Sequence, residues 1–177
     1  MLSLPVPSPM LPSTRRERER EKYRPKAIDL LLIAEAPPCS EDRYFYFDDV
    51  REHDWLFRYV IKGLFGATPP RDEKATYLSK LKAHGVYLID LSPNPLPDKA
   101  KPDASLVPNL VARAAALKPK HIILIKSAVY DLTHEPLVAK GLNVIDERMP
   151  FPTSGQQQKF EIAFARAINA AGWKVPK

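Results

Sequence analysis

Cysteine is almost absent from this sequence, because Cys39 is the only one among 177 residues. A single cysteine excludes a disulfide framework within the chain and any metal or iron–sulphur centre built on four cysteines. A reducing cytosol is the natural compartment for such a chain, so we expect a cytoplasmic protein without a cofactor. The four histidines show no metal-ligand spacing, and the sequence therefore predicts no metal site.

Long apolar runs are missing as well. No stretch approaches the roughly 20 residues of a membrane span, and the basic, proline-broken N-terminus lacks the continuous apolar region of a signal peptide. We therefore expect a soluble protein that does not associate with membranes. The chain also lacks the Gly-x-Ser-x-Gly turn and the Gly-x-x-x-x-Gly-Lys-Ser phosphate loop. A small-molecule hydrolase or transferase would fit an α/β fold, but it would need a nucleophile or phosphate-binding loop that this sequence does not show.

The length of 177 residues corresponds to one domain with a substantial core, and the net charge of +6 favours an anionic partner such as DNA. Residues 1–25 form a basic, proline-rich tail with too little apolar surface to pack. We predict that this tail is disordered or transiently helical. Its arginines could hold phosphates, but the interleaved glutamates favour a plain solvated extension. Residues 26–177 are predicted to form the folded domain.

From residue 27 onward, short apolar runs alternate with segments of helical periodicity, which is typical of βαβ units around a parallel sheet. The predicted strands span residues 28–34, 86–91, 121–126 and 142–146. The predicted helices span residues 49–65, 71–84, 105–117 and 157–171, and one more begins at residue 127. The pattern therefore predicts an α/β fold with a four-stranded parallel sheet.

The first predicted strand is an uninterrupted apolar run that ends in Glu35 and is followed by Ala36 and two prolines. Right-handed crossovers bring the carboxyl ends of parallel strands to one edge of the sheet. We therefore expect Glu35, Asp90, Lys126 and the loop at 148–155 to meet there. Glu35 is the leading candidate for chemistry, and the alternative is an acidic residue that starts a surface turn. The loop at 148–155 also leads into the last helix, whose free amide groups suit a phosphate.

Four segments in chain order resemble the uracil-DNA glycosylase superfamily. They are Glu35-Ala36-Pro37, residues 85–90, residues 117–124 and Phe151-Pro152-Thr153-Ser154. The resemblance covers about residues 26–172 and is closest to the branch with a Gly-Glu-Ala-Pro-Gly motif. It implies a three-layer α/β/α domain with a four-stranded parallel sheet, a groove for DNA and a pocket for one flipped base. It also implies hydrolysis of the N-glycosidic bond of uracil or another deaminated base.

The resemblance implies a role for each matching residue. Glu35 would orient water or stabilise the sugar cation, and Asp90 stands where the family usually has the asparagine that reads the base. The base would contact Ala36, Pro37 and an aromatic ring among Phe45, Tyr46 and Phe47. The DNA backbone would contact Pro152, Thr153, Ser154, Gly155, Gln156 and Lys126. No metal is implied, and a monomer is favoured.

Several positions depart from the family pattern. Phe151 replaces a histidine that stabilises the departing base in several branches, and an apolar ring cannot do this. Asp90 replaces an asparagine, and an ionised carboxylate would repel a pyrimidine carbonyl unless it is protonated. Pro38 replaces a glycine and removes an amide donor. Three functions therefore stay open: a glycosylase for a uracil or other damaged base, a small-molecule hydrolase or transferase, and a catalytically inactive nucleic-acid-binding or interaction domain on the same fold.

Overall fold

The computed structural model describes residues 14–49 and 54–175. Its sheet has three parallel strands in the order β2-β1-β3. These strands are β1 (Leu30–Ala34), β2 (Val86–Asp90) and β3 (His121–Leu124). Every residue of β1 and β2 is buried. Continuous apolar strands of this kind are expected in a parallel sheet that is covered on both faces.

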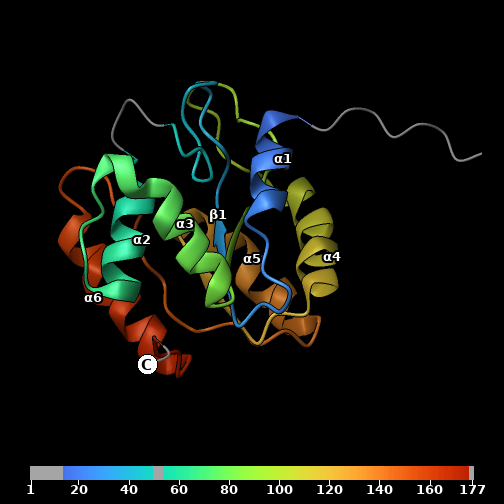
Figure 1. The fold of residues 1–177 in the computed structure, drawn as a ribbon. Coiled ribbons are helices and arrows are strands. Elements are labelled where there is room, and N and C mark those ends of the chain that lie inside the picture. The colour runs from blue at the N-terminus through green and yellow to red at the C-terminus, as the bar shows by residue number, and fades with distance from the viewer. Residues whose placement is uncertain (1–13, 50–53, 176–177) are drawn as a thin grey trace, which may run out of the picture.

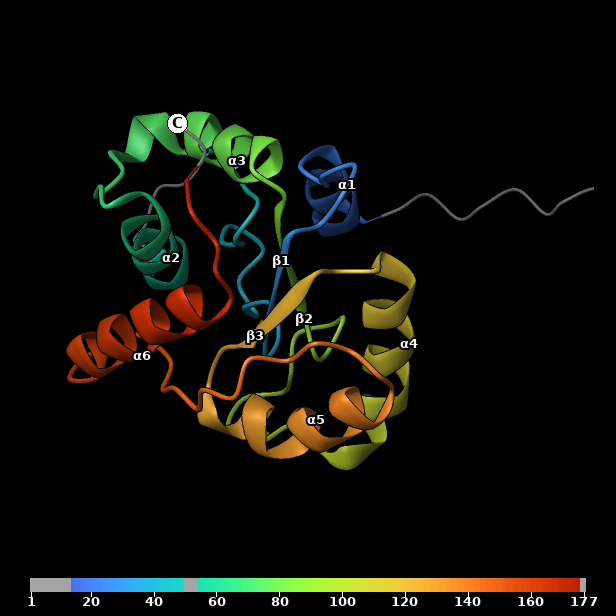
Figure 2. The ribbon, with the colours of Figure 1, turned by 90° about the horizontal axis from the view of Figure 1, so that it is seen from below.

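Helices cover both faces of the sheet (Figures 1 and 2). On one side lie α2 (Trp55–Phe65), α3 (Lys74–Ala83) and α6 (Gln157–Ala170), and on the other lie α4 (Val107–Leu117) and α5 (Ser127–Ala139). The chain passes from β1 to β2 in one direction, and then from β2 past β1 to β3 in the other. Right-handed crossovers in opposite directions place their helices on opposite faces of the sheet. The strand order therefore explains why helices cover both faces.

The five predicted helices are confirmed, with some shifts at their ends. The helix predicted from residue 49 begins at Trp55, because the Asp54 side chain accepts a hydrogen bond from the Phe57 amide and caps it. Residues 50–53 lie outside the described part of the chain. The helix predicted at residues 105–117 begins at Val107, because residues 104–106 form a short 3-10 turn (Ala104–Leu106) that is capped by Asp103. A second such turn (Arg71–Glu73) precedes α3.

The prediction of a fourth strand at residues 142–146 is wrong. In the part of the chain that the structure describes, this segment makes one parallel bridge, between Val144 and Ile122 of β3. On either side of the bridge, backbone amides bond outside β3, since Leu142 donates to the Leu137 carbonyl of α5 and Glu147 donates to the Ile145 carbonyl. Asn143 donates to a backbone carbonyl just before β3, and the Asp146 carboxylate accepts from a tyrosine hydroxyl of α5. The segment therefore leaves the sheet after one bridge, and the sheet has three strands instead of four.

The structure also differs from the predicted solvated tail. Residues 15–22 form α1 (Arg15–Lys22), which begins with a capping box and runs beside the edge strand β2, between α3 and α4 (Figures 1 and 2). None of its residues is fully buried. Polar contacts hold it instead, since Arg16 donates to the backbone oxygens of Pro38 and Ser40 at 3.0 and 3.2 Å. Residues 1–13 lie outside the described residues.

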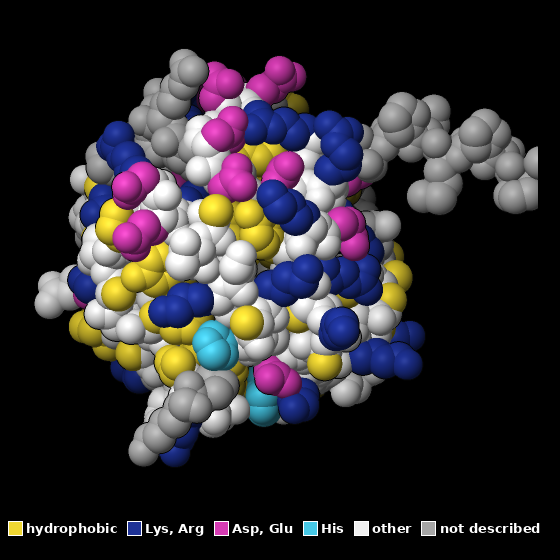
Figure 3. Space-filling view, in the orientation of Figure 1, with side chains coloured by type: hydrophobic (Ala, Val, Ile, Leu, Met, Phe, Trp, Pro, Cys, Tyr) yellow, Lys and Arg dark blue, Asp and Glu magenta, His cyan; other side chains and the backbone are white. Residues whose placement is uncertain are grey.

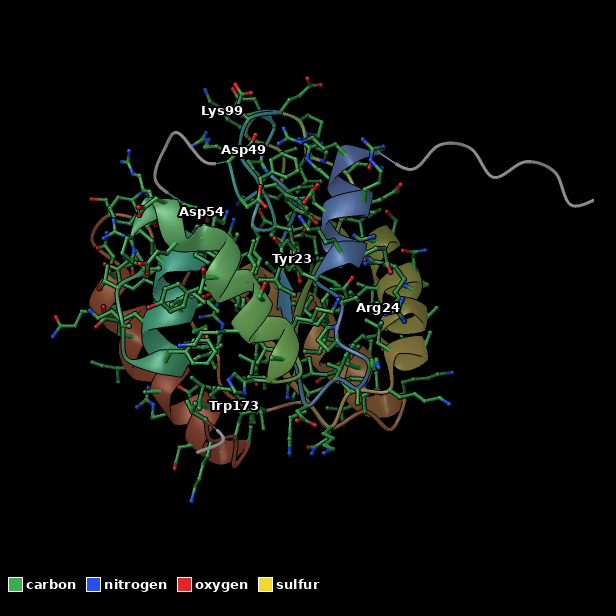
Figure 4. The ribbon with its side chains drawn as sticks, viewed as in Figure 1. Tyr23, Arg24, Asp49, Asp54, Lys99 and Trp173 are labelled. Carbon is green, nitrogen blue, oxygen red and sulfur yellow. The ribbon has the colours of Figure 1, made fainter. Side chains whose placement is uncertain are left out.

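Tyr23 connects α1 to the core. Its ring is 5% exposed and stacks on the ring of Tyr46, and it lies at the end of α1 in Figure 4. Its hydroxyl donates to Asp48 at 3.3 Å.

Among the described helices, none combines the length and apolar character that are needed to cross a membrane.

Candidate functional site

A cavity of about 400 Å³ opens at the carboxyl edge of the sheet. Its volume falls within the range of roughly 300–1,000 Å³ that is typical of small-ligand sites. The loop after β1, the end of β2, the residue before α5 and the start of α2 all contribute to its lining. The charged side chains that line it are Glu35, Arg43, Asp54, Asp90 and Lys126. The predicted convergence of Glu35, Asp90 and Lys126 at this edge is therefore present in the structure.

Glu35 and Lys126 form an ion pair inside the cavity. Lys126 Nζ donates to Glu35 Oε1 at 2.8 Å, and the two side chains are 39% and 20% exposed. They can meet because Glu35 follows β1 and Lys126 lies just after β3, the neighbouring strand. The ammonium group holds the carboxylate in one orientation. The structure thus places Lys126 against the candidate catalytic acid.

The backbone of Lys126 is strained. Its φ of 84° and ψ of 134° lie in a region that residues with a side chain rarely adopt. Such a conformation costs about 1–3 kcal/mol and persists only where the surrounding structure enforces it. Strained residues of this kind cluster at active sites and ligand clamps. The conformation therefore adds weight to Lys126 as a functional residue.

Asp90 presents a buried carboxyl group to the same cavity. It is the last residue of β2 and is 6% exposed. Burial raises its pKa to about 7, although the nearby Arg20, Arg113 and Arg16 act to lower it. Near neutral pH a large fraction of Asp90 is therefore protonated, and a protonated carboxyl can donate a hydrogen bond. The repulsion that we expected between an ionised Asp90 and a pyrimidine carbonyl is weaker in this environment.

Two arginines from different helices flank Asp90. Arg113 of α4 donates to the backbone oxygens of Asp90 and Leu91, both at 2.9 Å. Arg20 of α1 lies close enough to act electrostatically on Asp90 and on the hydroxyl of Tyr44, which also lines the cavity. The helix α1, which lies within the predicted solvated tail, therefore contributes to the electrostatics of the site.

The aromatic run at residues 44–47 is buried throughout, with exposed fractions of 2–5%. Of the three rings predicted to bind a base, Phe45 lines the cavity, together with its neighbour Tyr44. Tyr46 and Phe47 pack in the core instead, and the Tyr46 hydroxyl donates to the Leu88 carbonyl at 2.7 Å. The run is not extended, since the Phe47 amide donates to the Tyr44 carbonyl in a turn.

The other predicted contacts divide into two groups. Ala36, Pro37 and Thr153 line the cavity, as Lys126 does. Four residues lie outside its lining: Pro152, which is buried, Ser154 and Gly155, which are exposed, and Gln156, which is half-buried. At the predicted phosphate site before α6, the Gly155 amide donates to the side chain of Gln157 at 3.1 Å. An internal partner thus occupies that donor.

Lys74 supports the site from outside the cavity lining, and sequence reasoning missed it. It is 3% exposed, and its Nζ donates to the Tyr44 carbonyl at 3.0 Å and to Asp54 Oδ2 at 3.1 Å. Burial lowers the pKa of Lys74, while Asp54 opposes this effect. Asp54 stands at the start of α2 (Figure 4), so Lys74 ties this helix to the loop that carries Tyr44. In the sequence, Lys74 is a lysine on the inner side of a predicted helix, and this position by itself does not indicate a functional residue.

The fold and the cavity define an α/β protein with an acid–lysine pair and a buried carboxyl group at the carboxyl edge of a parallel sheet. No protein-family model matches the sequence, and no curated protein matches it. In residues 14–49 and 54–175, no group of three or more His, Cys, Asp or Glu side chains is placed to hold a metal ion.

Proposed function

We propose that this protein is a DNA glycosylase-like protein of the uracil-DNA glycosylase superfamily, which binds DNA and hydrolyses the N-glycosidic bond of a flipped uracil or other deaminated base. The observation that carries the proposal is the meeting of Glu35, Asp90 and Lys126 in one strand-end cavity. A base inside a duplex cannot be reached, so such an enzyme must receive the base outside the stack in a cavity of this kind.

Glu35 is the catalytic candidate. Cleavage of a glycosidic bond passes through a sugar with the character of an oxocarbenium ion, and a carboxylate beside that sugar stabilises the positive charge. A carboxylate can also orient the attacking water and accept its proton. The 2.8 Å contact with Lys126 holds Glu35 in place before the substrate binds. Lys126 therefore acts here as a positioning residue.

Asp90 and Phe45 are the candidates for contacts with the base. The Phe45 ring lines the cavity and offers an apolar surface to a base. A protonated Asp90 would donate to a base carbonyl and so stabilise the negative charge that develops as the base departs. Phe151 also lines the cavity, at the position where the family usually has a histidine. The neutral form of Asp90 thus supplies a donor that Phe151 lacks.

The charge of the chain supports an anionic polymer as the ligand. The net charge is +6, and Lys and Arg side chains lie over α1 and the adjoining surface, with acidic side chains among them (Figure 3). Positive surface charge supplies most of the affinity of non-specific DNA binding. The amino end of α1 reaches toward the carboxyl edge of the sheet, where the cavity opens (Figure 1).

The test of this proposal is a base-excision assay. Single-stranded and duplex oligonucleotides that contain uracil, hypoxanthine or xanthine are incubated with the protein, and alkali then cleaves any abasic site. We expect strand cleavage with at least one of these bases and none with an undamaged control. Binding to DNA without cleavage of any substrate would instead favour the inactive binding domain.

DNA binding by either kind of protein should weaken steeply with salt, because each neutralised phosphate releases counterions. A footprint of about four phosphates predicts roughly 100-fold weaker binding at 200 mM than at 50 mM salt. Lys99 is exposed, in the loop after β2, and lies at the carboxyl-edge end of the molecule in Figure 4. Lys99→Gln should therefore reduce the slope of log affinity against log salt concentration by the amount that about one phosphate contact contributes.

Lys140→Gln serves as the matched control for Lys99→Gln, because Lys140 is exposed at the end of α5, which runs away from the cavity. The affinities can be measured by fluorescence anisotropy with a labelled oligonucleotide. Affinity that stays constant across this salt range would contradict a DNA ligand and favour a small molecule or a protein.

A further inference from the structure

Lys126 has a second chemical capacity that positioning of Glu35 does not use. Its primary amine lies in the lining of the cavity. If Glu35 directs water to the C1′ carbon of the sugar, that carbon must lie beside the Glu35 carboxylate. Lys126 Nζ is 2.8 Å from this carboxylate, so it lies within reach of the same carbon. The surrounding structure enforces the strained backbone conformation from which this side chain extends.

The product of base excision is a substrate for such an amine. An abasic deoxyribose opens to an aldehyde at C1′, and a lysine amine attacks carbonyl carbons to form a Schiff base. The amine must first lose its proton, and the partner that can accept it is Glu35, at hydrogen-bond distance. Glu35 accepts this proton as the nitrogen attacks the aldehyde, so the carboxylate is still ionised when it acts on the sugar during base excision.

We propose that the protein is also a lyase for abasic sites in DNA, with Lys126 as the nucleophile and Glu35 as the base. This proposal depends on the DNA binding in the proposed function, but it does not require excision of a base. The activity would convert an abasic site directly into a strand break.

The proposed reaction needs no external oxidant or reductant. The Lys126 nitrogen bonds to C1′ of the aldehyde. Glu35 returns the proton that it took from Lys126 to the hydroxyl of this adduct, which leaves as water, so that a protonated imine forms and Glu35 is again a carboxylate. Glu35 then removes a proton from C2′, the electron pair forms a C2′–C3′ double bond, and the C3′–O bond breaks. The 3′ phosphate leaves with the downstream strand as its 5′ phosphate end. Water finally hydrolyses the imine, which frees the amine and an unsaturated aldehyde on the upstream strand.

The experiment uses the full chain and an oligonucleotide with a preformed abasic site. Sodium borohydride reduces an imine to a stable amine, so a Schiff base becomes a covalent protein–DNA band on a denaturing gel. We expect this band with the unmodified protein, strand cleavage without alkali, and the modified peptide to contain Lys126. Lys126→Arg should lose both the band and the cleavage, because a guanidinium keeps the charge opposite Glu35 but does not form the imine.

Lys140→Gln is the matched control and should retain the covalent band. Circular dichroism and binding to the abasic oligonucleotide show whether Lys126→Arg still folds and binds. No band with a binding-competent protein, or an equal band with Lys126→Arg, would overturn the lyase proposal. Excision of a base without a covalent band would overturn it while leaving the glycosylase proposal intact. A Lys126 band without excision would support the lyase and count against the glycosylase.

Discussion

Glu35→Gln should lower the rate of base excision on the order of 10²–10⁴-fold, the range typical of a lost general base. The amide keeps the size of the side chain and can still accept a hydrogen bond from Lys126, but it has no negative charge to face the sugar cation. Single-turnover excision from a labelled oligonucleotide measures the chemical step without product release. The fold should persist, because Glu35 is half-buried and its neighbours are unchanged.

Glu135→Gln is the matched control for this variant. Glu135 is exposed on α5, so this substitution makes the same chemical change away from the cavity. Its excision rate should equal that of the unmodified protein. If Glu35→Gln turned over at the unmodified rate while its thermal unfolding was unchanged, Glu35 would have no part in the mechanism.

Asp90→Asn should change how stability depends on pH. The folded-state pKa of Asp90 is raised to about 7 by burial, above its ordinary value of 3.8, so the folded protein binds more protons than the unfolded chain between these values. The stability that proton binding by Asp90 contributes to the folded state is fully present below about pH 4 and is lost as pH rises to about 7. From pH 5 to pH 8, the unmodified protein should therefore lose roughly 2–3 kcal/mol of unfolding free energy through this group.

Urea unfolding at pH 5 and pH 8 measures this effect. The asparagine variant cannot ionise, so its loss of stability over the same interval should be smaller by that amount. Asp72→Asn, at an exposed position before α3, is the control and should follow the unmodified protein. Equal losses for Asp90→Asn and the unmodified protein would show that Asp90 ionises normally in the folded state.

The sequence determined the α/β architecture because hydrophobic periodicity decides which faces of helices and strands are buried. The apolar runs at β1, β2 and β3 and the five helices that pack on them were all predicted from this pattern. The convergence of Glu35, Asp90 and Lys126 was also predictable, since parallel strands with right-handed crossovers end at one edge. Periodicity could not show that residues 142–146 would make a single bridge, because the backbone amides of Leu142 and Glu147 bond outside β3 and the apolar pattern does not contain these bonds.

Only the tertiary structure decided the electrostatics and the exact partners in the site. The packing of α1 depends on arginines that reach backbone carbonyls of a distant loop, and an analysis of apolar residues does not detect such contacts. The pKa of Asp90 depends on the burial of that side chain and on arginines from two helices. Likewise, the pairing of Lys126 with Glu35 joins residues 91 positions apart. Charge states and ion pairs follow from solvation and three-dimensional distance, and the order of residues along the chain contains neither quantity directly.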